Sequence, residues 1–377
     1  MSKSVNVDTE VNEQALKHLF GQEFLGRMSE SLAEVYPSFN QNHFLSLMPQ
    51  LKHLEMKPRV RFLRDELQKQ LPKDYPRALT ILLNSVERGR LKGFDLWPYT
   101  EFVQTYGLND LKLSFDALRF LTTLFTSEWA IRPFLKHYPK ETLDYLNRCA
   151  ADTNVHIRRW ACEGTRPRLP WGERLHDFVR DPSPSLAILE QLKFDPELYV
   201  RKSVSNHLND IAKDHPDLVL SILREWKKVG GQYYASQVDW IIRRALRTLI
   251  KDGHPGALEL IGVSQKIQIK LMDFNLHQKR LKMGERINFE FEIHSLSSQP
   301  QKLVVDYILH FVKANKTTAP KVFKLKMLEL PAKKTCKFIK SHHLKKITTR
   351  DYYSGLHFIE IQVNGLIAAR QEWTLEV

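Results

Sequence analysis

Apolar residues in the first two thirds of the chain recur three and four positions apart, which places them on one face of a helix. The pattern is clearest in four segments: 16–25, 59–71, 78–89 and 113–135. The third segment ends at Gly89, a common helix stop. The fourth predicts one long helix that breaks near its end, at Pro133. The region therefore predicts a mainly helical fold.

After residue 265 the pattern changes to alternating or continuous runs of β-branched and aromatic residues, which indicate strands. The runs lie at 287–296, 302–313, 321–330 and 333–344. Asn364-Gly365 near the end of the chain predicts a tight β-hairpin. About seven strands in some 110 residues favour an immunoglobulin-like sandwich. The sequence thus predicts a helical domain over 1–265 and a smaller all-β domain over 266–377.

Three segments of the helical region resemble one another: 152–164, 195–207 and 239–252. Each combines an aspartate, apolar positions and a pair of basic residues. The aspartates of the first two copies lie 43 positions apart, and the basic pairs of the second and third lie 42 apart. This period is typical of HEAT-like helix pairs that stack into a solenoid.

The repeat also predicts which residues share a surface, because positions four apart lie on one helical stripe. Stacked copies would align Glu163, Asn206 and Asp210 with basic residues beside them. We expect the three basic pairs to form a ribbon that faces phosphates: Arg158, Arg159, Arg201, Lys202, Arg243 and Arg244. Arg166 and Arg168, in the loop after the first copy, and Asn206 would belong to the same ribbon.

The formal net charge of +14 favours polyanionic partners, because neutralised phosphates release condensed counterions. Residues 268–377 hold nineteen Lys and Arg against ten Asp and Glu, so the predicted sandwich supplies most of this excess. Lysine on exposed strands also prevents edge-to-edge pairing of sheets. The charge therefore leaves two interpretations open, a nucleic-acid-binding module and an ordinary cationic surface.

Several classes of protein are disfavoured by the sequence. No apolar stretch is long enough to span a membrane, and the N-terminal segment has no export-signal pattern, so we expect a cytoplasmic protein. Its three cysteines are too scattered for a zinc site or a disulfide framework. A Gly-rich phosphate loop, HExxH, CxxC and GxSxG are all missing from the sequence. We therefore expect neither a metal nor a nucleotide cofactor.

The remaining candidates for chemistry are acids close to aromatic residues. Glu128 precedes Trp129, Glu163 follows Trp160 and precedes Trp171, and Asp210 belongs to the second repeat copy. Each has an ordinary explanation: Glu163 can pair with an arginine one turn earlier for about 0.3–0.5 kcal/mol, and such tryptophans are usually core. In a basic groove, however, carboxylates suit a developing positive charge, as in the cleavage of a sugar from a cationic base. Aromatic faces attract such a base.

Three segments carry a more specific signal: TSEWAIRPFL, RRWACEGTRPRLPWG and VRKSVSNHLNDIAKDHP, which together span 126–216. They resemble the AlkC branch of the DNA alkylation repair glycosylases, which are built from HEAT-like repeats with a C-terminal immunoglobulin-like domain. The resemblance implies a monofunctional enzyme that excises cationic N-alkylated bases of the 3-methyladenine type from duplex DNA. It implies a bacterial cytoplasmic monomer that needs no cofactor.

The resemblance also implies roles for individual residues. Asp210 is the leading candidate for the main catalytic carboxylate, with Glu128 and Glu163 holding the base or the water. Trp171 would line the base pocket, and we place Trp129 and Trp160 there with it. Two alternatives remain: a helical-repeat protein that binds nucleic acid without catalysis, and a scaffold that holds an acidic protein partner.

Overall fold

The computed structural model describes residues 16–347 and 350–377. The chain forms two compact units, Met1–Asp210 and Ile211–Val377. Helices end at Leu260 and strands begin at Ile269, on either side of the predicted change at residue 265. The last helices belong to the same compact unit as the strands. Within the described ranges, no helix has the length and apolar character needed to cross a membrane.

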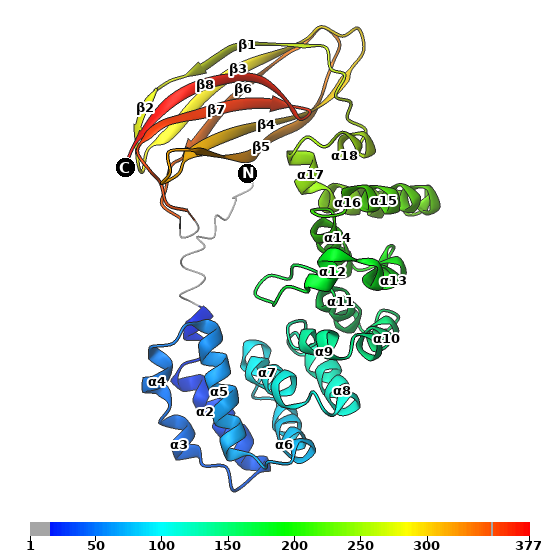
Figure 1. Ribbon diagram of the computed structural model, residues 1–377, viewed down its shortest axis with the longest axis vertical. Coiled ribbons are helices and arrows are strands. Elements are labelled where there is room, and N and C mark those ends of the chain that lie inside the picture. Colours follow the sequence, from blue (N-terminus) through cyan, green and yellow to red (C-terminus); the bar gives the residue numbers. More distant parts are fainter. Residues whose placement is uncertain (1–15, 348–349) are drawn as a thin grey trace. The chain divides into compact units, whose positions relative to one another are not determined.

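The first unit is helical throughout its described length, and Figure 1 shows its helices following one another in chain order from blue to green. Their bounds are α2 Gln22–Val35, α3 Gln41–Leu45, α4 Met48–Lys52, α5 Met56–Gln70, α6 Tyr75–Glu87, the 3₁₀ helix η1 Gly93–Leu96, α7 Trp97–Tyr106, α8 Leu111–Thr122, α9 Arg132–His137, α10 Pro139–Cys149, α11 Val155–Gly164, α12 His176–Arg180, α13 Ser183–Leu192 and α14 Leu198–Ile211.

The helices predicted over 59–71 and 78–89 are confirmed. In α5 the expected positions Val60, Leu63 and Leu67 are fully buried. Helix α6 begins after Asp74, whose carboxylate accepts the N–H of Arg77 at 3.0 Å and so satisfies a free donor of the first turn. It ends before Gly89, which adopts the left-handed φ of 75° that favours glycine.

The single long helix predicted over 113–135 is wrong. Helix α8 ends at Thr122 and α9 begins only at Arg132, with Pro133 in its first turn rather than at its end. Two side chains replace helical hydrogen bonds at the break: the Thr122 hydroxyl accepts the N–H of Ser127, and the Ser127 hydroxyl donates to the carbonyl of Leu118. The intervening turn carries Glu128 and Trp129.

The first two repeat copies form α11 and α14, and the packing around α11 is that expected of HEAT-like helix pairs. Helices α10, α11 and α13 pack against one another, and α11 also contacts α8 of the preceding pair. The third copy differs, because α16 (Ala235–Ala245) ends before Leu246 and α17 (Arg247–Lys251) starts after it. The stripe expected through Arg244, Thr248 and Asp252 is therefore interrupted, because the two segments are separate helices.

The second unit joins four helices to a β-sandwich. The helices are α15 (Pro216–Gly230), α16, α17 and α18 (Pro255–Leu260). The strands are β1 Ile269–Leu276, β2 Arg280–Lys282, β3 Arg286–Ser295, β4 Gln301–Val312, β5 Thr318–Leu330, β6 Thr335–His343, β7 Gly355–Val363 and β8 Leu366–Glu376. All the predicted strands are present, with β1 and the three-residue β2 in addition.

The sandwich consists of one sheet with the order β1-β3-β6 and another with the order β2-β8-β7-β4-β5. Its core alternates along the strands, as in β3, where Ile287, Phe289, Phe291 and Ile293 are fully buried. The hairpin between β7 and β8 turns at Asn364-Gly365, with φ values of 50° and 82°. This confirms the predicted hairpin. Strand β5, which holds many of the lysines, is an edge strand.

Candidate active site

Three buried carboxylates meet in the first unit from three different elements. Glu128 lies in the turn before α9, Glu163 near the end of α11 and Asp210 in the last turn of α14. Their exposed fractions are only 7%, 4% and 2%. Buried carboxylates require compensating partners. The structure supplies them with two arginines.

The acids and arginines alternate in a chain that we call the acid–arginine ladder: Glu128, Arg159, Glu163, Arg166 and Asp210. Arg159 donates to Glu128 at 2.6 Å and lies 3.7 Å from Glu163. Arg166 donates from Nη1 to Glu163 at 2.8 Å and from Nε to Asp210 at 2.9 Å. Three carboxylates thus share two guanidinium groups. The sequence prediction that Glu163 and Asp210 lie close together is supported by their common partner.

The electrostatics keep both arginines charged. Burial alone would lower the pKa of Arg159, but the carboxylates of Glu128 and Glu163 raise it. Burial also lowers the pKa of Arg166, but the carboxylates of Glu163 and Asp210 raise it by more. The Arg159 guanidinium also lies over the ring of Tyr199, 4.9 Å from its centroid. Both groups were expected to anchor phosphates. In the structure their polar atoms are directed at carboxylates inside the protein.

The first basic residues of the first two repeat pairs, Arg158 and Arg201, bind groups inside the protein. Arg158 binds Asp195 at 2.6 Å and donates to the carbonyls of Asp152 and Thr153. Arg201 donates to the carbonyls of Asp195 and Pro196, both at 2.7 Å. Both arginines therefore fix the turn before their own helix. Their placement does not favour a role at a phosphate.

The remaining predicted DNA contacts are more accessible. Lys202 is exposed, and Asn206 and Arg168 are half-buried. In the second unit Arg243 is exposed, while Arg244 is half-buried with its guanidinium 5.6 Å from the ring centroid of Trp240.

A stack of three tryptophans lines a pocket in the same unit: Trp97, Trp129 and Trp171. The centroid of Trp97 lies 4.7 Å from that of Trp129 and 6.0 Å from that of Trp171. Two of the three were predicted, and Trp97 was missed. Trp160, which was also placed in the pocket, is instead fully buried in the core, where its ring meets that of Tyr145 edge-on at 6.3 Å.

Another buried carboxylate, that of Glu101, was not predicted from the sequence. It lines the pocket of the three tryptophans together with Lys57 and Arg61. Burial raises the pKa of its carboxyl group, although the nearby cations oppose the shift. The available signal was the sequence WPYTE, in which Trp97 and Glu101 stand four positions apart on α7.

The loop that carries Trp171 is fixed by side chains from two other elements. Arg132, which is 1% exposed, donates to the carbonyls of Gly164 and Arg166 at 3.0 and 2.8 Å and also to that of Glu173. The indole N–H of Trp129 donates to the carbonyl of Pro170 at 3.0 Å. The loop is thus preorganised.

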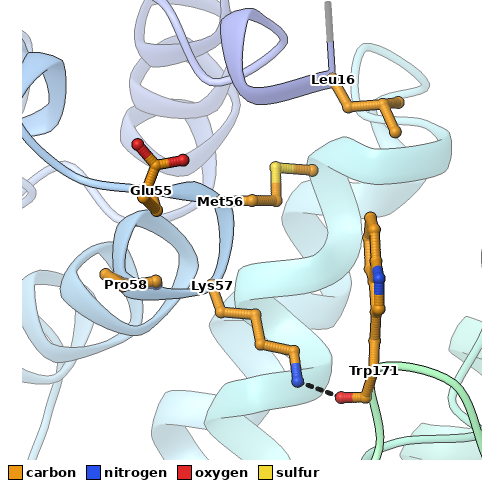
Figure 2. A pocket seen from close by; sticks show the side chains of 6 residues that line it. All are labelled: Leu16, Glu55, Met56, Lys57, Pro58 and Trp171. Carbon is orange, nitrogen blue, oxygen red and sulfur yellow. Dashed lines mark hydrogen bonds between the residues drawn. The ribbon is translucent and has the colours of Figure 1, made fainter. Parts of the chain in front are cut away.

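Trp171 itself has a left-handed φ of 61° and an exposed fraction of 43%. Figure 2 shows Lys57 donating to its carbonyl, with Leu16 and Met56 among the other residues that line the same pocket. The cavity has a volume of about 400 Å³. The strain of such a backbone persists only where the surroundings enforce it. An indole held in this way can present its face to a ligand.

Comparison with known proteins agrees with these features. Residues 122–249 match the family model of the DNA alkylation repair enzymes, and residues 270–377 match that of the C-terminal Ig-like domain of the uncharacterised protein YhaZ. The chain is 38% identical to the uncharacterised protein YhaZ of Bacillus subtilis over 93% of its own length and 96% of the relative.

A solved structure shows the same similarity in three dimensions. The alkylpurine DNA glycosylase AlkC of Pseudomonas fluorescens, bound to DNA containing an abasic site analog, is 39% identical, with a TM-score of 0.90. The similarity covers 96% of this chain and 99% of that one. The chain therefore belongs to the AlkC-like family of DNA alkylation repair glycosylases with a C-terminal immunoglobulin-like domain.

Proposed function

We propose that this protein excises cationic N-alkylated bases of the 3-methyladenine type from duplex DNA by hydrolysis of the N-glycosidic bond. The observation that carries the proposal is the acid–arginine ladder, which has one carboxylate more than it has guanidiniums. Buried carboxylates stabilise a nearby cation and repel a phosphate, because the interior screens their charge poorly. The likeness to AlkC supports DNA as the partner.

The chemistry needs few groups beyond those present. A base with a fixed positive charge leaves with the electrons of the glycosidic bond and becomes neutral, so no acid must protonate it. The sugar develops oxocarbenium character, which a carboxylate stabilises. Water then adds to the sugar carbon and gives up one proton to a carboxylate of the ladder. We assign the main carboxylate to Asp210, with Glu128 and Glu163 holding the base or the water.

The tryptophan stack supplies the second requirement, recognition of the base. Trp171 exposes its indole beside Trp97 and Trp129, and each aromatic contact with a stacked base contributes about 1–3 kcal/mol. A cationic base gains additional attraction to these ring faces. The lesion would thus be selected for its charge by both the carboxylates and the aromatic faces.

The proposal is tested by measuring free bases released from methylated duplex DNA. We expect Asp210→Asn to lower the rate of release by about 10²-fold or more, because a neutral amide cannot stabilise the cation. Duplex affinity should be unchanged or tighter. Asp195→Asn is the matched control, since Asp195 is also buried and bound to one arginine but lies outside the ladder.

Two results would contradict the proposal. Binding of methylated duplex without release of bases by the wild-type protein would leave a non-catalytic helical-repeat binder as the better description. Equal rates for Asp210→Asn and Asp195→Asn would remove Asp210 from its role. Urea unfolding of both variants separates loss of chemistry from loss of folding.

A further inference from the structure

A pocket in the second unit is lined by basic side chains from both its helices and its sandwich. Arg243 from α16, Arg247 and Lys251 from α17, and Lys324 from β5 line a space of about 100 Å³. Asp306 of β4 is the only acid among the lining residues. The pocket therefore carries a net positive charge, well away in sequence from the acid–arginine ladder.

The walls of this pocket are fixed to one another. The side-chain amide of Gln362 on β7 donates to the carbonyl of Lys251 at 2.9 Å, and that of Asn364 donates to the carbonyl of Ser264 at 2.7 Å. Val304, which lines the pocket from β4, packs with Leu258 of α18. Four cations are thus held around one space on a preorganised frame.

Asp306 lies at the floor of the pocket and is only 1% exposed. It stands at an irregularity in the pairing of β4 with β5, where its register partner is Lys324. Its Oδ1 atom has no hydrogen-bond partner among the residues that the structure describes. A buried oxygen of this kind costs about 1–3 kcal/mol unless a ligand or a proton satisfies it. The basic pocket therefore contains a buried carboxylate oxygen that lacks a hydrogen-bond partner within the described residues.

We propose that this pocket binds one phosphodiester group of the nucleic-acid backbone, and that Asp306 takes up a proton when the phosphate binds. The proposal rests on the proposed function, which supplies duplex DNA as the partner. Phosphate oxygens accept hydrogen bonds from guanidinium and ammonium groups. A protonated Asp306 adds one O–H donor at the floor, whereas an ionised Asp306 repels the phosphate.

The environment of Asp306 makes this proton uptake accessible near neutral pH. Burial raises the pKa of its carboxyl group to about 6, although Lys324 and Lys251 oppose the shift. Gln362, its register partner on β7, is uncharged. A bound phosphate raises the pKa further, so binding consumes a proton above pH of about 6. Affinity for duplex DNA should therefore increase as the pH falls toward that value.

The first test removes a cation and measures the affinity for an undamaged duplex oligonucleotide at several salt concentrations. Loss of one phosphate contact reduces the slope of log affinity against log salt by about 0.9. We expect this change for Lys324→Ala, because the exposed lysine lines the pocket on an edge strand. Lys282→Ala is the control, since it removes the same charge from an exposed position of β2 outside the pocket.

The second test concerns the proton. Asp306→Asn should bind the duplex several-fold more tightly than wild type at about pH 8 and lose the gain in affinity that wild type shows on acidification to about pH 6. Asp273→Asn, at an exposed position of β1, removes the same charge without this effect.

Equal salt slopes for Lys324→Ala and Lys282→Ala, or equal pH profiles for Asp306→Asn and Asp273→Asn, would overturn the phosphate site. Base release by the wild-type protein, measured on the same preparation, separates the two proposals. If the wild-type protein releases bases but each variant has the same salt slope or pH profile as its control, only the phosphate site is contradicted. If it releases none but the slopes and profiles differ as expected, only the glycosylase is contradicted.

Discussion

Arg166 is the residue on which the candidate site depends most. Its Nη1 atom binds Glu163 of its own repeat and its Nε atom binds Asp210 of the next one. Two carboxylates from different helices would repel each other without this cation. Because the guanidinium is planar and carries its donors at fixed angles, it also fixes the separation of the two acids.

A lysine keeps the charge of Arg166 but cannot reproduce the two bonds from separate nitrogens. We predict that Arg166→Lys lowers the free energy of unfolding by about 1–3 kcal/mol and slows base release by at least about tenfold. Urea unfolding and the release assay measure the two effects. The control is Arg119→Lys, because Arg119 forms a half-exposed pair with Asp152 and should change stability by less than about 1 kcal/mol. Similar losses in both variants would contradict a special role for Arg166.

His207 gives the fold a predictable sensitivity to acid. It is fully buried next to Cys162, with Nδ1 3.2 Å from the Cys162 carbonyl and Nε2 3.3 Å from the Ser185 hydroxyl. Burial, with a contribution from Arg166, lowers its pKa to about 3. The pKa of a histidine in an unfolded chain is about 6.5. The neutral ring therefore stabilises the fold fully above that pH.

As the pH falls from about 6.5 toward 3, the unfolded chain gains a proton that the folded chain cannot accept. We predict that His207 alone removes about 1.4 kcal/mol of stability per pH unit over this window. His207→Gln should make the urea midpoint fall less steeply with acid than in wild type. His277→Gln serves as the control, because His277 is exposed and follows the end of β1. Parallel acid profiles for wild type and His207→Gln would contradict the assignment.

At the scale of elements, the loop after α11 is held in place chiefly by Arg132 of α9. Its guanidinium satisfies carbonyls of Gly164, Arg166 and Glu173. Burial lowers the pKa of Arg132 to about 10, and the neighbouring Arg166 contributes, so the group remains charged at neutral pH. The position of Trp171 therefore depends on a residue from another helix.

We predict that Arg132→Met destabilises the protein by about 3 kcal/mol or more, because buried carbonyls lose their donors. The exposed Trp171 should also become more mobile, which tryptophan fluorescence anisotropy would detect. Lys136→Met removes the half-exposed partner of Glu173 from the same helix and should cost less than about 1 kcal/mol. An unchanged urea midpoint for Arg132→Met would contradict this account.

The sequence predicted the helical character of the first region, the helices at 59–71 and 78–89, most strands and the approach of Glu163 to Asp210. Spacing along a helix and between repeats is local information, which the sequence carries. The sequence did not predict the break in 113–135, since that depends on the hydroxyls of Thr122 and Ser127 finding partners. The roles of Arg158 and Arg201 were also hidden. The sequence of a basic pair in a repeat does not distinguish a residue that contacts a phosphate from one that, as here, fixes a turn.

At the scale of the whole molecule, the second unit depends on close contact between its helices and its sandwich. Gly253, just after α17, faces Gly365 of the β7–β8 turn so closely that a Cβ on Gly253 would lie 2.6 Å from the Gly365 Cα. Both glycines have left-handed φ values, 72° and 82°. The basic pocket lies beside this contact, between α17 and β4–β5.

We predict that Gly253→Ala lowers the free energy of unfolding by about 3 kcal/mol or more, because a strained φ and a backbone clash add together. Gly262→Ala is the matched control: its φ is 75°, but its Cβ would meet only the flexible end of Lys302 at 3.5 Å. That variant should cost only about 1 kcal/mol. If the contact also sets the pocket walls, Gly253→Ala weakens duplex binding under conditions where it is still folded, whereas Gly262→Ala does not. Equal urea midpoints for the two variants would show that the close contact of Gly253 with Gly365 adds nothing to stability.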